Sequence, residues 1–256
     1  TQGYSSAASD VYKRQMLTLF SSRKTIRQSN LLWGMTDVHS HLLPGVDDGV
    51  PNEVEALRIL KYLQEIGVSR LYLTPHIMGD LEKNTSENLK ERFDAFARIC
   101  PDWIELRLAG EYMLDSCFEK QRKTGLLVMN GRHVLVETSY MSAPPDFLNM
   151  LYDLSLDGYT PILAHPERYL YMADEDYRVL KDRGYKFQLN LMSLHGIYGR
   201  RAAQVSHCLL KNGYYDYVGS DLHWLGVYED TVEHLLLTRT EQQQLKALLE
   251  NNHSLW

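Results

Sequence analysis

Histidine and carboxylate side chains stand at chemically suggestive spacings near the start of the main part of this sequence. The chain carries the motif DVHSH at residues 37–41 and the motif DDG at residues 47–49. If the first motif ends a strand, His39 and His41 lie on one face, because strand side chains alternate with period two. Neutral imidazole is the commonest protein ligand for transition-metal ions. Alone, an H-x-H motif is more often an ordinary histidine pair.

The same residue types recur along the chain and strengthen the metal interpretation. The candidate donors are five imidazoles and four carboxylates, namely His39, His41, His76, His165 and His223 with Asp48, Glu111, Glu137 and Asp221. Mixed nitrogen and oxygen donors without thiolate suit manganese, iron or zinc and are unsuited to copper(I) or iron–sulfur clusters. Nine donors are too many for one ion, so we expect two or three.

Short apolar runs alternate with longer amphipathic segments from residue 35 onward. The pattern predicts seven strands, over Met35–Val38, Arg70–Thr74, Ile104–Ala109, His133–Thr138, Thr160–Ala164, Lys186–Leu191 and Tyr217–Ser220. It predicts helices over residues 53–66, 86–99, 113–122, 145–156, 174–182, 200–211, 229–237 and 241–250. Such alternation is typical of a parallel β/α architecture.

The candidate donors follow nearly every predicted strand. In a β/α barrel the C-terminal ends of the strands converge on one mouth, where binding and catalysis occur. An open, doubly wound sheet would gather functional residues at one switch point instead. The distribution therefore favours a closed barrel with a metal site at its mouth.

Length and composition indicate one barrel-sized domain. With 256 residues and 44% hydrophobic content, the chain can bury a full core. We expect this domain over residues 35–256, after a flexible extension over residues 1–34. Residues 1–15 resemble a translated leader and are excluded from fold reasoning. The basic and apolar residues 16–30 leave weak peripheral membrane contact as an alternative to a flexible lead-in.

Charge and cysteine usage narrow the partners and the compartment. A formal net charge of -6 disfavours a nucleic-acid-binding surface. Cys100, Cys117 and Cys208 are scattered without metal-type spacing, and an odd number argues against a disulfide framework, so we predict a cytoplasmic protein. No apolar run reaches the length that a membrane-spanning helix needs.

The donor motifs resemble those of the polymerase-and-histidinol-phosphatase (PHP) superfamily. The closest resemblance is to its bacterial branch of manganese-dependent protein-tyrosine phosphatases of the CpsB/YwqE type. It covers about residues 35–225 and rests on DVHSH with DDG, on HPERY at residues 165–169 and on SDLH at residues 220–223. The resemblance implies a distorted seven-stranded, TIM-like β/α barrel with a three-metal site. The nine candidate donors would be the ligands, and Arg168 would bind phosphate.

The resemblance also implies the substrate and the chemistry. The substrate would be a phosphotyrosine-containing protein, namely a tyrosine kinase of capsule or exopolysaccharide synthesis, and manganese would be the ion, with iron or zinc as alternatives. A metal-bridging hydroxide would attack phosphorus, because bound metal lowers the pKa of water from ~15.7 toward roughly 7. Arg168 would hold two phosphate oxygens with its planar fork. His223 or water would assist the leaving phenolate, and Asp48 would act as a ligand rather than as a base.

One departure from the family concerns phosphate binding. Relatives in this branch can place a further arginine a few residues after the final histidine, whereas residues 224–228 read WLGVY. Either Arg168 suffices, Arg200 or Arg201 substitutes, or phosphate binding is weaker. The structural alternative for Arg168 is a surface salt bridge with Glu167.

The sequence disfavours a thiol mechanism and leaves two other functions open. A thiol mechanism needs an arginine six residues after the cysteine, and none of the three cysteines has one. A phosphatase for a small molecule, such as histidinol phosphate or a sugar phosphate, stays open, as does a non-catalytic, metal-stabilised regulatory module. Tyr169 and Tyr171 suit either core packing or a docking surface. His195 is expected to be a loop histidine without a partner.

Overall fold

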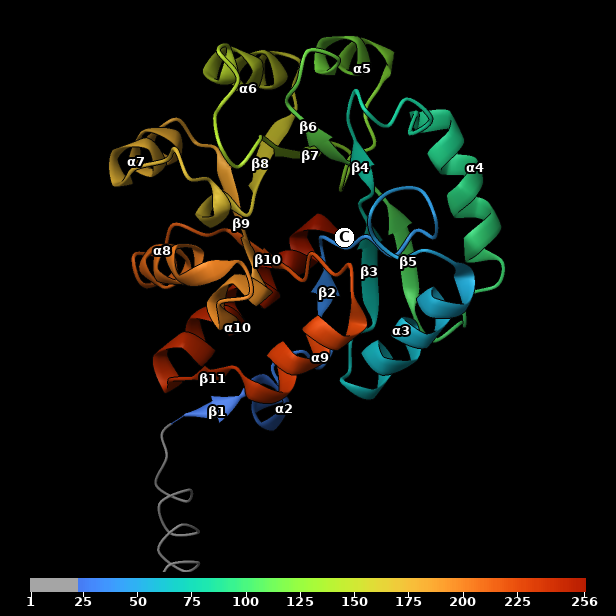
Figure 1. Cartoon of the computed structure of the whole chain (residues 1–256), viewed down its shortest axis with the longest axis vertical. Coiled ribbons are helices and arrows are strands. Elements are labelled where there is room, and N and C mark those ends of the chain that lie inside the picture. Colours follow the sequence, from blue (N-terminus) through green and yellow to red (C-terminus); the bar gives the residue numbers. More distant parts are fainter. Residues whose placement is uncertain (1–22) are drawn as a thin grey trace, which may run out of the picture.

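The computed structural model describes residues 23–256, in which parallel strands curve around a common centre with helices outside them (Figure 1). The strands are β1 (Lys24–Thr25), β2 (Thr36–Asp37), β3 (Arg70–Leu73), β4 (His76–Ile77), β5 (Glu105–Leu108), β6 (Glu111–Met113), β7 (His133–Glu137), β8 (Thr160–Ala164), β9 (Lys186–Asn190), β10 (Tyr217–Gly219) and β11 (Leu236–Leu237). The α-helices are α2 (Ile26–Ser29), α3 (Glu53–Glu65), α4 (Ser86–Ala97), α5 (Phe118–Thr124), α6 (Phe147–Leu156), α7 (Asp174–Asp182), α8 (Gly199–Lys211), α9 (Leu225–His234) and α10 (Arg239–Asn252). Short 3-10 helices are η1 (Pro166–Arg168), η2 (Leu191–His195) and η3 (His253–Leu255). Within residues 23–256, none of these helices has the length and apolar character needed to cross a bilayer.

The helix α3 illustrates how the amphipathic segments become outer helices. The Asn52 side chain accepts a hydrogen bond from the Glu55 backbone N–H and so begins the helix. Gly67, at φ 90°, lets the chain turn away just after its end. Its buried residues recur every three or four positions, as a one-sided helix requires. They are Ala56, Ile59, Leu60 and Leu63.

Parallel ladders join the central strands into two sheets that are continuous along the chain. The sheets have the orders β10-β9-β8-β7-β6-β4 and β2-β3-β5. β3 passes into β4 across Pro75, and β5 passes into β6 across Gly110. Proline has no N–H for a ladder, and a Cβ at Gly110 would lie 2.5 Å from Cδ1 of Ile77. These two residues explain why each strand is interrupted there.

The strands form a curled parallel half-barrel sheet, and the predicted closed seven-stranded barrel is not confirmed. Beyond β2 and β10, the two chain segments share one isolated bridge, Ser40 to Leu222. The backbone N–H of Asp221 donates to the carbonyl of His39 at 2.8 Å, and that of His41 donates to Leu222 at 3.0 Å. We call this contact the β2–β10 seam. Regular pairing stops here because Asp221 leaves the extended conformation, with φ 51°.

An apolar cluster fills the inside of the curled sheet at the end opposite the donors. Val38, Tyr72, Ile162 and Leu255 belong to it, and the Tyr72 hydroxyl donates to the carbonyl of Leu255 at 2.7 Å. In Figure 1 the C-terminal end accordingly lies near the middle of the strands. This packing leaves only the other end of the sheet open for a site.

The structure corrects three predicted boundaries. Residues 111–113 continue as β6, so the helix predicted over 113–122 begins later, as α5. Leu236–Leu237 pairs with Lys24–Thr25 as an antiparallel strand instead of ending a helix. That pairing and the burial of Ile26 fix part of the extension predicted to be flexible. The predictions for residues 1–15, and for the lead-in before residue 23, lie outside the described residues.

Candidate metal centre

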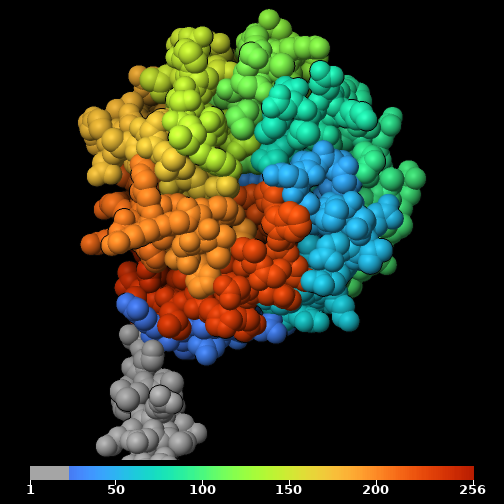
Figure 2. Space-filling view, viewed as in Figure 1, coloured from blue at the N-terminus to red at the C-terminus, as the bar shows by residue number. Residues whose placement is uncertain are grey.

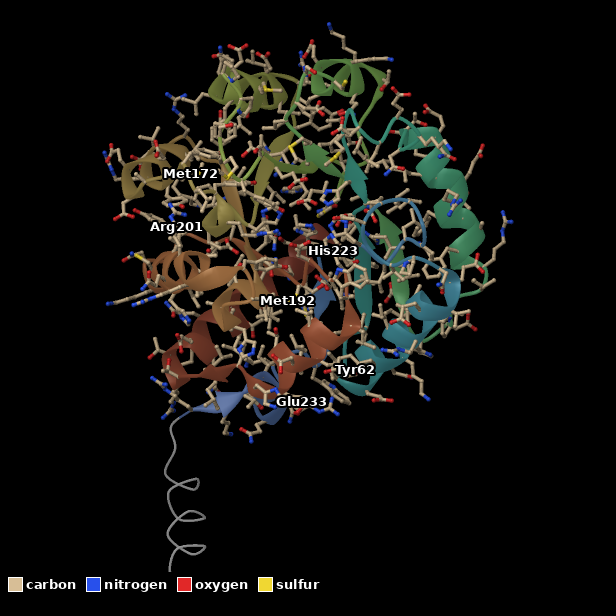
Figure 3. All side chains as sticks on the ribbon, in the orientation of Figure 1. Tyr62, Met172, Met192, Arg201, His223 and Glu233 are labelled. Atoms are coloured by element: carbon tan, nitrogen blue, oxygen red, sulfur yellow. The ribbon has the colours of Figure 1, made fainter. Side chains whose placement is uncertain are left out.

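All nine predicted donors lie at one end of the curled sheet, and His223 is seen near its middle (Figure 3). They come from the ends of β2 (His39, His41), β7 (Glu137), β8 (His165) and β10 (Asp221, His223), from the starts of β4 (His76) and β6 (Glu111), and from the loop before α3 (Asp48). The expected convergence of strand ends therefore occurs. His76 and Glu111 reach the same level because β4 and β6 begin where β3 and β5 break.

The donors form four overlapping groups, each with its ligand atoms within 4.8 Å of one another. The groups are His41 with Asp48, His76 and His223; His39 with Glu111 and His165; His39 with His41 and Asp221; and His76 with Glu111 and Glu137. Because His39, His41, His76 and Glu111 each belong to two groups, the arrangement suits neighbouring ions with shared ligands.

The chemistry at the centre of the cluster fits bound cations. Nε2 of His39 and Nε2 of His41 are 3.1 Å apart, and both face Oε2 of Glu111 at 3.3 Å. Among the nine donors, four buried atoms have no hydrogen-bond partner, namely Oε2 of Glu111, Nδ1 of His76, Oε1 of Glu137 and Nδ1 of His165. Buried polar atoms without partners are strongly unfavourable. Divalent ions between these lone pairs would satisfy them and offset the carboxylate charge.

Two neighbouring side chains orient the first histidine pair. Nδ1 of His39 is 2.8 Å from Oε1 of Gln188, and Nδ1 of His41 is 2.9 Å from Oδ2 of Asp47. An Nδ1–H donated to these oxygens leaves both Nε2 lone pairs facing the cluster. Although burial opposes its ionisation, the nearby His41 holds the pKa of Asp47 below its ordinary value. Asp47 also accepts the backbone N–H of Gly49 at 3.0 Å, so it is both a turn residue and a partner of the site.

Two of the donors sit on strained backbone. His165 and Asp221 have φ values of 34° and 51°, a left-handed region that is unfavourable for residues with a Cβ. Backbone hydrogen bonds hold both, from His165 to the carbonyl of Gln188 at 2.9 Å and from Asp221 to that of His39 at 2.8 Å. Strain retained in this way is concentrated at functional sites.

Arg168 points into the cluster, and its salt bridge with Glu167 was a wrong alternative. Its Nη1 donates to Oδ2 of Asp221 at 2.7 Å. Glu167 is fully buried on the other side of η1 and accepts the Asn190 backbone N–H at 3.0 Å and the Tyr215 hydroxyl at 2.9 Å. Burial raises the pKa of Glu167. Glu167 therefore fixes the loop that carries His165 and Arg168.

The structure argues against Arg201 as a substitute arginine, and it gives His195 a partner, contrary to the expectation. Arg201 donates to the carbonyls of Tyr169 at 2.9 Å and Met172 at 2.8 Å, and Figure 3 places it beside Met172, away from His223. Both carbonyls lie in the segment after η1, so the Arg201 guanidinium is engaged there and does not serve as a second phosphate-binding arginine. Nε2 of His195 is 3.0 Å from Oδ2 of Asp230.

Sequence reasoning missed four residues that support or line the site. Gln188 and Asn190 stand two positions apart in β9, and Nδ2 of Asn190 donates to Oδ2 of Asp221 at 2.7 Å. The alternation of polar Gln188 and Asn190 with apolar neighbours was a usable signal for one polar face. Tyr140 and Tyr198 lie in loops after β7 and η2, and no local pattern marked them.

A cleft of about 230 Å³ leads from the surface to the cluster. Asp48, His76, His165, Arg168, Asp221 and His223 line its depth, and Tyr140, Met192, Ile197, Tyr198, Trp224 and Val227 complete its walls. The segments around residues 50, 200 and 225 meet near the centre of this face in Figure 2. A larger cavity, of about 500 Å³, lies between α6 and α7 and contains none of the donors.

The accessible polar groups in the cleft are Asp48, whose side chain is 75% exposed, and His76, Arg168 and His223, whose side chains are 13%, 15% and 17% exposed. The side chains of His39, Glu111 and Asp221 are 2% exposed or less. A ligand therefore meets the arginine and the outer imidazoles before the buried donors. Among the described residues lining the cleft, Arg168 is the sole arginine or lysine.

Comparison with known proteins identifies similar sequences. Residues 35–249 match the family described as capsular polysaccharide synthesis, CpsB/CapC. Tyrosine-protein phosphatase YwqE of Bacillus subtilis (strain 168) is 28% identical over 201 residues, which cover 74% of this chain and 77% of YwqE. Tyrosine-protein phosphatase CpsB of Streptococcus pneumoniae is 28% identical over 163 residues, covering 61% of this chain and 67% of CpsB.

Similar solved structures agree with the fold. One chain comes from the crystal structures of YwqE from Bacillus subtilis and CpsB from Streptococcus pneumoniae, described as unique metal-dependent tyrosine phosphatases. It has a TM-score of 0.74 and 25% identity, covering 86% of this chain and 94% of that chain. The phosphotriesterase homology protein from Escherichia coli has a TM-score of 0.52 and 14% identity, covering 87% of this chain and 98% of that chain, and shows the fold alone.

Proposed function

Because the chain belongs to the CpsB/CapC family of capsular polysaccharide synthesis, we propose that it is a metal-dependent tyrosine-protein phosphatase. Its substrate would be a phosphotyrosine-containing protein, namely a tyrosine kinase of capsule or exopolysaccharide synthesis. The observation that carries the proposal is the set of four overlapping donor groups at the base of a cleft with a guanidinium on its wall. A cytoplasmic location is part of the proposal and agrees with three unpaired cysteines in the described chain.

We propose that two or three divalent ions occupy the site, with manganese as the ion and iron or zinc as alternatives. The ligands would be His39, His41, Asp48, His76, Glu111, Glu137, His165, Asp221 and His223. Hard carboxylate oxygens mixed with imidazole, and no sulfur, support this choice. Nδ1 of His76 lies 3.0 Å from Oε2 of Glu111 and 3.0 Å from Oε1 of Glu137, and none of these buried atoms makes a hydrogen bond, which also supports it. Asp48 belongs with the ligands, because its Oδ1 is 3.4 Å from both His76 and His223.

The protein's own residues would prepare the phosphoryl group for attack. Bound divalent ions would supply Lewis-acid activation of water at neutral pH and neutralise phosphate charge. Arg168 would hold two phosphate oxygens with parallel N–H donors. Gln188 and Asp47 keep His39 and His41 in the tautomer that faces the cluster.

The cleft walls would select and release an aryl group. Ile197 and Trp224 offer apolar and aromatic surface around the opening, which suits a phenyl ring better than a sugar. His223 lines the cleft and is partly exposed, so a water beside it would reach the departing oxygen and supply its proton. Because a phenolate is a good leaving group, a strong general acid is unnecessary.

Phosphate release by metal-loaded protein tests this function. We expect hydrolysis of para-nitrophenyl phosphate and of a tyrosine-phosphorylated peptide with Mn²⁺, and none with excess chelator. Faster turnover of histidinol phosphate than of the peptide would favour a small-molecule phosphatase instead. Protein that holds its metal and releases no phosphate from any aryl ester would contradict the enzymatic function and favour a regulatory module.

A further inference from the structure

The guanidinium of Arg168 lies against two tyrosine rings from different loops. Its Cζ is 4.4 Å from the ring centre of Tyr140 and 4.0 Å from that of Tyr198. We propose that these two residues, here called the tyrosine clamp, are positioning residues that hold Arg168 ready for phosphate. The inference rests on the proposed function, of which it specifies how the phosphate group is captured.

The clamp is anchored on its Tyr140 side by a stack of rings. The Tyr140 ring stacks on Tyr169 at 6.4 Å, and Tyr169 stacks on Tyr171 at 5.6 Å. Tyr169 is fixed in turn, since its hydroxyl donates to the carbonyl of Ala164 at 2.9 Å and accepts the Thr138 N–H at 3.2 Å. The carbonyl of Tyr140 also accepts the Leu170 N–H at 2.8 Å. The ring position is therefore set by the two loops that follow β7 and β8.

The remaining contact of Arg168 is a hydrogen bond, which fixes one edge of its guanidinium plane. Nη1 donates to Oδ2 of Asp221, which Asn190 also contacts at 2.7 Å. The described residues give its other guanidinium nitrogens no protein acceptor, so those N–H groups remain for a ligand. The contacts with Tyr140 and Tyr198 place the guanidinium over ring faces rather than against a lone-pair acceptor, so they restrict the side chain without engaging these N–H groups in conventional hydrogen bonds.

Holding this one cation matters because the cleft offers no second guanidinium or ammonium group among its described lining residues. A free arginine side chain loses considerable rotamer freedom when it binds an anion. Rings that already restrict Arg168 remove much of that cost before phosphate arrives. The clamp thus accounts for phosphate capture by a single arginine.

Tyr198 gives the sharpest test, because it lies in a loop and is only partly buried. With inorganic phosphate as the probe on Mn²⁺-loaded protein, Tyr198→Leu should weaken binding about tenfold, while Tyr198→Phe should stay within about twofold. Tyr140→Leu should act in the same direction. kcat/KM on para-nitrophenyl phosphate should fall in parallel, and metal content should not change. Tyr152→Leu, at an exposed position on α6, is the matched control.

A double-mutant cycle distinguishes positioning from direct contact with the ligand. In an Arg168→Leu background, Tyr198→Leu should cause no further loss, because the clamp acts through the arginine. Additive losses, or a Tyr198→Phe variant as weak as Tyr198→Leu, would overturn the inference, as would folded Leu variants with unchanged phosphate binding. Should Tyr140→Leu fail to fold, the Tyr198 series decides.

Failure of the proposed function would look different. A wild-type protein that binds inorganic phosphate but hydrolyses no aryl ester would contradict the phosphatase and leave the clamp to be judged on binding. A metal-loaded wild type without measurable phosphate binding would overturn the clamp itself.

Discussion

His39 and His41 each use one ring nitrogen for a buried hydrogen bond and present the other to the donor cluster. The partners, Gln188 and Asp47, are not ligands themselves, yet they decide which nitrogen carries the proton. Residues in this position often affect metal affinity nearly as much as the ligands do.

Replacing Gln188 with leucine should therefore weaken metal binding about 10- to 100-fold. The change removes the acceptor for Nδ1–H of a fully buried imidazole and leaves that donor unsatisfied. Competition with a chromogenic chelator would measure the affinity. Gln243→Leu, at an exposed position of α10, serves as control, and equal affinities in the two variants would contradict the role given to Gln188.

Arg168→Lys should retain metal and lose phosphate recognition. Lysine keeps the charge but lacks the planar fork and the faces that contact Tyr140 and Tyr198. We expect kcat/KM for an aryl phosphate to fall tenfold or more, roughly the worth of one charge-assisted hydrogen bond. Steady-state kinetics together with metal analysis provide the check. Lost metal would instead show that Arg168 maintains Asp221 as a ligand.

At this scale the sequence indicated which side chains would lie together, and their binding of metal stays a prediction. The nine donors were recognisable because imidazoles and carboxylates followed predicted strands, and the structure gathers them. Tyr140 and Tyr198 were not recognisable, since a tyrosine in a loop has many ordinary uses and their shared partner depends on how two loops fold. The salt bridge with Glu167 was wrong because adjacent residues in η1 point in opposite directions.

At the level of elements, η1 links three strands through one carboxylate. Glu167 accepts hydrogen bonds from Asn190, which ends β9, and from Tyr215, which precedes β10. It thereby ties the loop after β8 to the end of β9 and to the segment that precedes β10. The motif HPERY thus holds a proposed metal ligand (His165), the carboxylate that fixes the loop (Glu167) and the proposed phosphate-binding arginine (Arg168) in one short segment.

Glu167→Ala should destabilise the fold by about 2–4 kcal/mol, because it leaves a buried N–H and a buried hydroxyl without acceptors. Glu167→Gln should be milder, since an amide oxygen can still accept. Urea unfolding at constant metal concentration would give both values. A loss below about 0.5 kcal/mol for the alanine variant would show that η1 does not depend on this carboxylate.

The strands were more predictable than their breaks and joins. All seven predicted strands appear, because their apolar runs are buried or, in β5, half-buried. The short continuations β4 and β6 were missed, since two or three residues after Pro75 and Gly110 carry too little pattern. Leu236–Leu237 was assigned to a helix because its pairing with β1 depends on residues far away in the sequence.

On the scale of the whole molecule, metal and stability should be coupled. The donor cluster draws on loops and strands from residue 39 to residue 223, so ions bound there would stabilise only the folded chain. At ion concentrations about 100-fold above the dissociation constant, the gain is ~2.7 kcal/mol. For a chain of this length, chelation should lower Tm by roughly 5–10 °C. Calorimetry with and without chelator would measure it, and an unchanged Tm would indicate that no ion supports the fold.

The β2–β10 seam should also couple the rate of ion release to the rate at which the sheet opens locally. One isolated bridge links the two chain segments there, with His39 on one side of the seam and Asp221 on the other. An ion shared by these two residues would act as a cross-link over the seam, where the lateral pairing of the sheet is weakest. Release of the ion and transient opening of the seam should therefore be a single event. Amide hydrogen exchange at His41 and Asp221 should then accelerate together when chelator is added, whereas amides inside the β7–β8 ladder should keep their rates.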